Sequence, residues 1–238
     1  MKIPSLAKQL VPASVRNFVR QRRHAKAALQ PPLHEKLLPL IASYRIHGER
    51  GFYVESGAHD GVAASNTLPL ERLGWRGILV EPSVSAFEAC KRNRAPDNHF
   101  VNCALVGDPD LSSVRGDFDG HPMSSIDSVR RRTGTLSEVP AQTLQAILDR
   151  HDIKRFDFLS LDVEGAELEV LRGINFSRSA PTLVVVEIYD KDRDEIFDFM
   201  SSRGYTLPID VSGFTKSNYP YWDGTHNDYF FALDSDKI

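Results

Sequence analysis

The sequence lacks most of the features that would place it in a specialised class of protein. Two cysteines, Cys90 and Cys103, are too few for a disulfide framework in 238 residues, so a reducing cytoplasm is the expected setting. No apolar run approaches the roughly 20 residues that span a membrane. The net charge of −3 gives no overall basic surface for nucleic acid. The remaining composition, 41% hydrophobic and 26% charged, predicts a globular domain with a full core.

Acidic residues are absent from residues 1–30, although this segment contains lysines, arginines and apolar residues at roughly helical spacing. A basic amphipathic helix of this kind can lie on an anionic membrane surface. A helix packed on its own domain, or a frayed end, is the alternative. The long apolar core and cleavage site of a secretory signal are missing. We therefore expect a basic segment over 1–30 and a domain over 31–238, in the cytoplasm, with contact to the inner face of the membrane as one option.

The stretch FYVESGAHDG at residues 52–61 predicts a strand, a glycine turn and the start of a helix. Glycine lets a ligand approach the backbone closely, and a helix start offers free N–H groups. The next apolar strand ends at Glu81, 26 residues after Glu55. An acidic residue at the tip of the second strand is well placed to hold ribose hydroxyls. The first half of the chain therefore predicts a nucleoside-binding site.

The glycine spacing differs from the G-x-G-x-x-G of a dinucleotide-binding turn. Here Gly57 and Gly61 are four residues apart, and Asp60 lies between them. Asp60 would repel a pyrophosphate but could face an ammonium group, which favours S-adenosylmethionine and disfavours a nicotinamide-dependent oxidoreductase. A glycine pair with this spacing is also compatible with a strand–helix turn that binds no ligand. The position of Glu81 at the end of the next strand favours the cofactor-binding turn over this alternative.

Alternating strands and helices predict an open, mostly parallel sheet with helices on both faces. Further strands are expected at 99–105, 156–163, 182–188, 205–209 and 228–233. Residues 107–137 contain few apolar anchors and predict a long loop. Ligands bind such sheets at the carboxyl ends of the strands, where Asp162, Glu164 and Glu187 are also expected.

Three blocks resemble the FkbM-type family of S-adenosylmethionine-dependent methyltransferases: ESGAHDG at 55–61, residues 65–82, and DFLSLDVEGAELEVL at 157–171. The closing NDYFF at 227–231 is similar to the family's last strand. The resemblance implies a Rossmann-like, seven-strand class I methyltransferase fold with an antiparallel last strand. It also implies O-methylation of a small molecule or glycan, commonly a saccharide, as in polysaccharide biosynthesis.

The resemblance also implies roles for individual residues. Gly57, Ala58 and Gly61 would line the methionine part of the cofactor, Glu81 the ribose, and Cys103 with Ala104 the adenine edge. In the family, the position of Asp162 is expected to contact the cofactor, a metal ion or the acceptor. The full set of candidate cofactor-binding residues is Glu55, Gly57, Ala58, Gly61, Asn66, Glu81, Cys103, Ala104 and Asp162.

Methyl transfer to a hydroxyl requires in-line alignment and removal of a proton by a base, or a divalent cation that lowers the hydroxyl pKa. Asp162 and Glu187 offer the oxygen ligands that Mg²⁺ takes. Asp162 and His226 are the candidate catalytic residues. A helix cap is the alternative role for Asp162, and a favourable charge at a helix N-terminus is the preferred one for Glu164. A family-like binding or scaffold protein without turnover is the alternative function.

Overall fold

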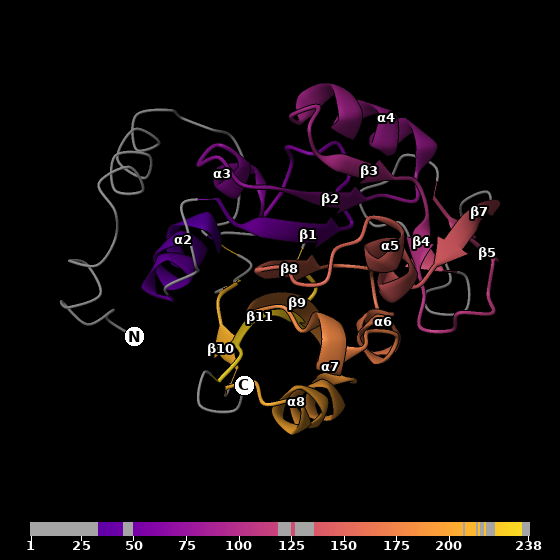
Figure 1. The fold of residues 1–238 in the computed structure, drawn as a ribbon. Helices are drawn as coiled ribbons and strands as arrows, with labels where there is room; N and C mark the ends of the chain where they lie inside the picture. The colour runs from indigo at the N-terminus through magenta and orange to yellow at the C-terminus, as the bar shows by residue number, and fades with distance from the viewer. Residues whose placement is uncertain are drawn as a thin grey trace.

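The computed structural model describes residues 33–44, 50–118, 125–126, 136–206, 208–212, 214, 217 and 222–234. Its centre is a seven-stranded sheet with the strand order β10-β11-β9-β8-β1-β2-β3 (Figure 1). The strands are β1 (Phe52–Ser56), β2 (Arg76–Val80), β3 (His99–Val101), β8 (Phe158–Leu161), β9 (Leu183–Tyr189), β10 (Ile209–Asp210) and β11 (His226–Ala232). β11 runs antiparallel to β9 and β10, while the other neighbouring strands are parallel. This arrangement confirms the predicted fold class.

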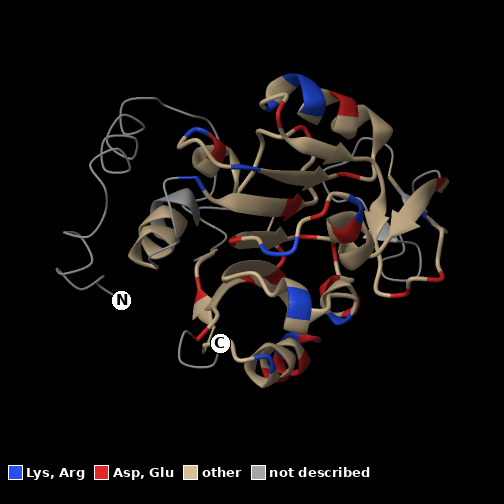
Figure 2. Ribbon diagram, viewed as in Figure 1, with Lys and Arg blue, Asp and Glu red and all other residues tan. Residues whose placement is uncertain are grey.

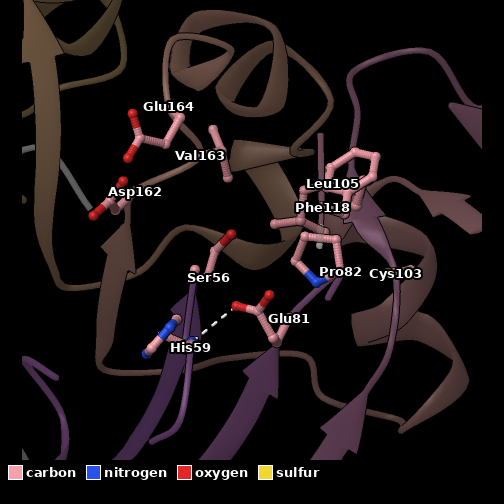
Figure 3. Close-up of a pocket in the computed structure, with 12 residues that line it drawn as sticks. Ser56, His59, Glu81, Pro82, Cys103, Leu105, Phe118, Asp162, Val163 and Glu164 are labelled. Atoms are coloured by element: carbon pink, nitrogen blue, oxygen red, sulfur yellow. Dashed lines mark hydrogen bonds between the residues drawn. The ribbon is translucent and has the colours of Figure 1, made fainter. Parts of the chain in front are cut away.

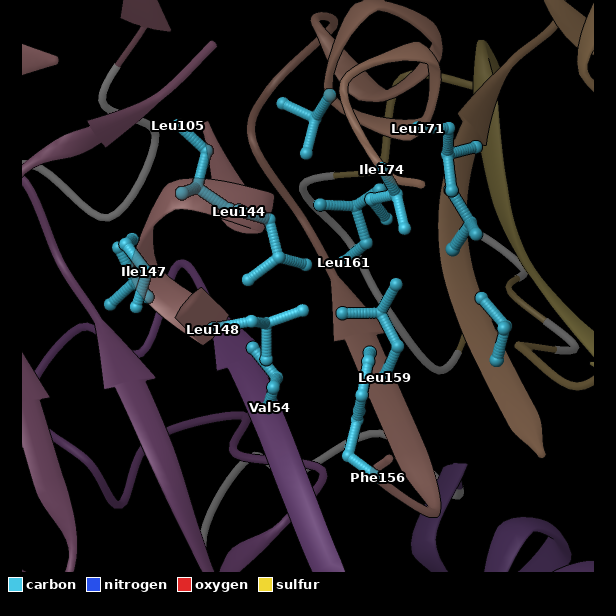
Figure 4. Packing of buried hydrophobic residues seen from close by; sticks show 14 of the residues in the cluster. Val54, Leu105, Leu144, Ile147, Leu148, Phe156, Leu159, Leu161, Leu171 and Ile174 are labelled. Atoms are coloured by element: carbon cyan, nitrogen blue, oxygen red, sulfur yellow. The ribbon is translucent and has the colours of Figure 1, made fainter. Parts of the chain in front are cut away.

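One face of the sheet packs against three helices, which are α5 (Leu144–Arg150), α6 (Glu167–Arg172) and α8 (Arg193–Ser202). Val54 and Leu159 project from neighbouring strands into this core (Figure 4). Val184 of the next strand belongs to the same core. Both faces of β8 are buried, so its sequence is apolar almost throughout, as in other parallel strands covered on two sides.

The opposite face is covered by α2 (Leu33–Ser43), α3 (Leu68–Glu71) and α4 (Val84–Asn93). Leu37 of α2, Leu70 of α3 and Cys90 of α4 belong to the same buried cluster as Tyr53 and Phe158 of the sheet. A further short helix, α7 (Phe176–Ser179), precedes β9. The helices on two faces leave the carboxyl edge of the central strands to loops, and that edge carries the site.

A second, smaller sheet follows β3, and the expectation of one long loop over 107–137 is wrong. Its strands, in the order β4-β7-β5-β6, are β4 (Ala104–Leu105), β5 (Ser113–Asp117), β6 (Ser125–Ile126) and β7 (Ser137–Gln142). The strand predicted over 99–105 is accordingly two strands in two sheets. Val106, Val114, Phe118 and Val139 are the main members of a core of their own.

The small sheet meets α6 through direct backbone contact at two glycines. A Cβ atom on Gly107 would lie 2.2 Å from the carbonyl oxygen of Glu169, and one on Gly173 would lie 3.1 Å from the Cα atom of Gly107. No side chain fits between these segments, so glycine is required at the first position.

Within the part of the chain that the structure describes, no helix has both the length and the apolar character to cross a bilayer. The basic amphipathic segment predicted over residues 1–30 lies outside the described residues.

Candidate active site

A cleft of about 580 Å³, partly continuous with solvent, opens at the carboxyl ends of β1, β2 and β8 (Figure 3). It lies at the position where open parallel sheets bind their ligands. The lining residues are Ser56, Gly57, His59, Glu81, Pro82, Cys103, Ala104, Leu105, Phe118, Asp162, Val163 and Glu164. In Figure 3, Asp162 and Glu164 lie on one side of the cleft, and Pro82, Leu105 and Phe118 lie on the other.

Glu81 follows β2 and is held from two sides by backbone N–H groups. His59 donates to Oε2 and Ser83 donates to Oε1, each at 2.8 Å. Burial raises the pKa of Glu81, and these two hydrogen bonds oppose the increase. An ionised carboxylate can accept about four hydrogen bonds, so two positions remain for a ligand. The arrangement suits a pair of neighbouring hydroxyls.

The turn after β1 leaves no room for a side chain at Gly57. This residue has φ of +74°, and a Cβ atom on it would lie 2.2 Å from the carbonyl oxygen of Asp162. His59, two residues later, also has a positive φ, of +47°. The strained turn therefore presents bare backbone to the cleft and aims the N–H of His59 at Glu81.

The opposite wall of the cleft is apolar and comes mainly from the small sheet. Cys103, Ala104 and Leu105 lead into and form β4, and Phe118 follows β5. Burial raises the pKa of the Cys103 thiol to about 12, so this side chain acts as a small apolar group. Such a wall fits the flat face of a purine. Phe118 was missed by sequence reasoning because it falls in the segment read as a loop.

Carboxylates gather at the far end of the cleft. Asp162, Glu167 and Glu187 each offer an oxygen within 4.8 Å of the others. Asp162 is exposed to the cleft. Burial and then the neighbouring Glu164 and Glu167 raise its pKa well above the usual value, and a hydrogen bond from the backbone of Glu164 opposes this. Burial likewise raises the pKa of Glu167 to about 7.

His226 lies next to this acidic end on β11. Its Nε2 is 3.5 Å from Oε1 of Glu187, and its Nδ1 is 3.5 Å from Oδ1 of Asp223. The ring centroids of Tyr189 and Phe214 lie 5.2 and 5.9 Å from that of His226. The imidazole therefore sits between carboxylates and aromatic rings.

The structure brings five of the predicted cofactor-binding residues to one cleft: Gly57, Glu81, Cys103, Ala104 and Asp162. The predicted metal ligand Glu187 is close to Asp162, and the predicted base His226 is next to Glu187. These seven predicted residues thus lie close together at the carboxyl edge of the sheet.

Four other predicted cofactor-binding residues are not among those that line the cleft. Glu55 is buried, and its carboxylate accepts hydrogen bonds from Ser65, Thr67 and Arg94. The remaining three residues are Ala58, which belongs to the core, Gly61, which packs on Cys90 and Arg94, and Asn66, which donates to Ser160.

The helix-end roles considered for Asp162 and Glu164 do not occur. α6 begins at Glu167, with Ala166 as its N-cap, so neither residue lies in its first turn. Glu164 has φ of +59° and accepts a hydrogen bond of 3.0 Å from the hydroxyl of Tyr189. The preferred reading of Glu164 as a helix-terminus charge is therefore wrong, because the loop continues for two further residues and turns its carboxylate to the cleft.

A mostly parallel seven-stranded sheet with antiparallel final strands, and a cleft of this kind at its carboxyl edge, define a class I methyltransferase fold. The model of the methyltransferase FkbM domain matches residues 55–207, well over half of the chain. The protein belongs to this family of methyltransferases, which supports methyl transfer from S-adenosylmethionine. No curated protein sequence matches the chain.

Solved structures of other methyltransferases resemble the chain at low identity. Precorrin-6y C5,15-methyltransferase from Geobacter metallireducens is 14% identical with a TM-score of 0.46, over 89% of this chain and 92% of that one. A TehB-like S-adenosylmethionine-dependent methyltransferase from Corynebacterium glutamicum is 12% identical with a TM-score of 0.41, over 94% and 100%. One from Geobacter sulfurreducens, in complex with S-adenosylhomocysteine, is 10% identical with a TM-score of 0.39, over 94% and 98%. Likenesses this distant carry no argument about the site.

Proposed function

We propose that the protein transfers a methyl group from S-adenosylmethionine to a hydroxyl of a saccharide or glycan-like acceptor. One observation carries this proposal: a single cleft joins the anchored carboxylate of Glu81, an apolar wall and the acidic end at Asp162. Each part matches a different part of the cofactor or its acceptor.

The chemistry of the cleft residues suits each part of the cofactor. The two free acceptor positions of Glu81 suit the ribose hydroxyls, and Leu105 with Phe118 suits the adenine. The bare turn at Gly57 leaves room for the methionine part. Bound S-adenosylmethionine supplies a methyl group on a sulfonium, and its carbon–sulfur bond breaks, with both electrons left on sulfur, as the acceptor oxygen bonds to the carbon.

The chain's own residues then have to align the acceptor and take its proton. Asp162 is the carboxylate that opens to the cleft, and His226 is the imidazole beside the acidic end. Either Asp162 or His226 is proposed to accept the hydroxyl proton. A divalent cation such as Mg²⁺, held by Asp162 and Glu187, could assist by lowering the pKa of the hydroxyl. In-line transfer would require the acceptor oxygen to lie about 3 Å from the methyl carbon.

A saccharide is favoured by the aromatic rings near these groups. Tyr189 and Phe214 flank His226, and the indole N–H of Trp222 donates to the backbone carbonyl of His226 at 2.7 Å. Aromatic faces can pack on the C–H faces of a sugar ring, while carboxylates accept hydrogen bonds from its hydroxyls. The resemblance to the family pointed to the same acceptor class.

The proposal is tested first by binding and then by turnover. Calorimetry should detect S-adenosylhomocysteine and no NAD. Labelled S-adenosylmethionine and a panel of saccharides should then give an alkali-stable O-methyl product, which separates an ether from a methyl ester. Asp162→Asn should retain the shape of the site and slow transfer.

Two outcomes would contradict the proposal. Binding of S-adenosylhomocysteine without transfer to any hydroxyl acceptor would favour the scaffold alternative. Full activity of Asp162→Asn would remove Asp162 from the reaction in both the direct and the cation-assisted version.

A further inference from the structure

We infer that Asp162, Glu167, Glu187 and Asp228 form a binding site for one divalent cation at the acidic end of the cleft. The first observation is the distance between the carboxylates. Oxygens of Asp162, Glu167 and Glu187 all lie within 4.8 Å of one another. Carboxylates held this closely repel one another unless they bind protons or a cation lies among them.

No basic side chain supplies that cation among the described residues. Within the described ranges, none of the four carboxylates forms an ion pair with a lysine or arginine, and the one ion-pair partner found there is His226, 3.5 Å from Glu187. β8, β9 and β11 contain no lysine or arginine at all. Figure 2 shows acidic residues reaching the central strands, while the basic ones lie mainly on the surrounding helices and loops.

The second observation is that two of these groups are buried and short of partners. Oε2 of Glu187 is buried and accepts no hydrogen bond. Asp228 is only 8% exposed, and among the described residues its carboxylate has no hydrogen-bond or ion-pair partner. Buried polar atoms in native proteins are almost always satisfied, so Oε2 of Glu187 points to a ligand that the described residues do not provide.

The sheet brings these groups to the same place. Asp228 lies directly opposite Glu187 in the antiparallel pair of β11 and β9, so both side chains leave the same face. Asp162 follows Leu161, which is paired with Val186, the neighbour of Glu187. The three carboxylates therefore form a row across β8, β9 and β11 at one level of the sheet.

Glu167 completes the row from the start of α6. Its Oε1 accepts hydrogen bonds of 3.0 Å from the backbone N–H groups of Val163 and Gly165, which fixes the side chain and leaves Oε2 for a cation. A set made only of carboxylate oxygens is typical of a hard cation, and Mg²⁺ is the one we assign.

The role of the cation rests on the proposed function. A cation at this position lies where the acceptor hydroxyl is expected to meet the methyl group. It would lower the pKa of that hydroxyl and so assist loss of the proton. Binding of the cation itself does not depend on the identity of the acceptor.

The experiment uses the full chain and Mn²⁺ as a paramagnetic probe for Mg²⁺. Titration followed by electron paramagnetic resonance should show one site per chain, and Mg²⁺ should displace the Mn²⁺. Glu187→Gln and Asp228→Asn should each weaken Mn²⁺ binding at least about tenfold, since loss of an outer-shell partner alone has that effect. Glu88→Gln removes an exposed carboxylate from α4 and should leave binding unchanged.

Thermal unfolding separates a cation site from a merely structural cluster. In EDTA, Asp228→Asn should melt at or above the temperature of the wild type, because it removes repulsion. Added Mg²⁺ should raise the melting temperature of the wild type by several degrees and leave that of Asp228→Asn unchanged. Failure of the wild type to bind Mn²⁺, or Mn²⁺ binding unaffected by both substitutions, would overturn the inference.

A parallel titration with S-adenosylhomocysteine in EDTA keeps the two proposals apart. Binding of S-adenosylhomocysteine by a protein that ignores Mn²⁺ would refute the cation site alone. If Glu187→Gln then weakened S-adenosylhomocysteine binding, the cofactor's ammonium would be the cation that the carboxylates hold. No S-adenosylhomocysteine binding under any condition would refute the proposed function, whatever the result with Mn²⁺.

Discussion

Glu81 shows how a single carboxylate can be fixed before any ligand arrives. Two backbone N–H groups hold it, from His59 and Ser83, and only its remaining acceptor positions face the cleft. Glu81→Ala should weaken S-adenosylhomocysteine binding by about 2 kcal/mol, roughly 30-fold, because hydrogen bonds to a charged group are lost. Isothermal calorimetry measures the change.

Glu88→Ala is the matched control for this measurement, since the Glu88 side chain is exposed on α4 and forms an ion pair with Lys91. It should bind S-adenosylhomocysteine with wild-type affinity. Equal affinities for the Glu81 and Glu88 variants would show that Glu81 does not contact the ribose.

Gly57 is the residue at which backbone geometry and the site depend on each other most directly. Gly57→Ala should destabilise the fold by about 1–2 kcal/mol from the left-handed backbone, and by a further 1–3 kcal/mol from the clash with the carbonyl of Asp162. Urea unfolding measures the sum, and S-adenosylhomocysteine binding should fall with it.

Gly74→Ala separates the cost of the left-handed backbone from the cost of the steric clash. Gly74 has φ of +98°, but a Cβ atom there would meet nothing within 4 Å. This variant should lose only the backbone part of the stability and keep its affinity for S-adenosylhomocysteine. If both variants lost the same stability, the close approach of the turn to Asp162 would be without consequence.

At the scale of elements, the end of α4 is tied to β1 and α3 by one buried arginine. Arg94 donates to Glu55 of β1 and to Glu71 of α3, each at 3.0 Å, and its side chain is completely buried. Arg94→Met should destabilise the protein by about 3–5 kcal/mol, because two buried carboxylates lose their partner. The free energy of unfolding in urea tests this.

Arg92→Met provides the comparison, because Arg92 is exposed on the same helix. Its substitution should change the free energy of unfolding by less than about 0.5 kcal/mol. A loss of similar size in both variants would mean that the Arg94 network contributes no more than a surface charge.

Which strand-end acids reach the cleft was only partly predictable from the sequence. The rule that ligands meet the carboxyl ends of strands found Glu81 and Asp162, and it found Glu55 for the same reason. What turns Glu55 inward is Arg94, which lies 39 residues further along the chain and closes a buried ion pair. A local pattern contains no signal for such a distant partner.

The second sheet was hidden from the sequence for a related reason. β5 reads SVRGD, with only Val114 buried as an apolar residue, and it is completed by pairing with β7 more than 20 residues later. β8 and β9 could be predicted from the local sequence alone, because strands buried on both faces are apolar almost throughout. Phe118, at the end of β5, was lost from the predicted site along with its strand.

At the scale of the whole molecule, the charge is unevenly distributed between the first 30 residues and the rest. The net charge of −3 includes seven lysines and arginines in an acid-free segment. Deletion of residues 1–30 should abolish sedimentation with anionic liposomes, because basic residues near an anionic surface each contribute about 1 kcal/mol. S-adenosylhomocysteine binding by the truncated chain should be unchanged.

The control for this prediction is a set of neutral liposomes, to which the full chain should bind weakly. Binding to anionic liposomes should also fall as salt is raised, since surface charges are screened. If the full chain ignores anionic liposomes at low salt, the segment has another role.

The glycine contact between the small sheet and α6 has a thermodynamic consequence for ligand binding. Gly107 and Gly173 bring backbone against backbone, and backbone atoms have no rotamers to freeze. The apolar wall at Leu105 and the loop at Val163 are therefore held at a set spacing before a ligand enters. Little ordering entropy is left to be lost when the cleft is filled, and this part of the binding free energy is retained as affinity.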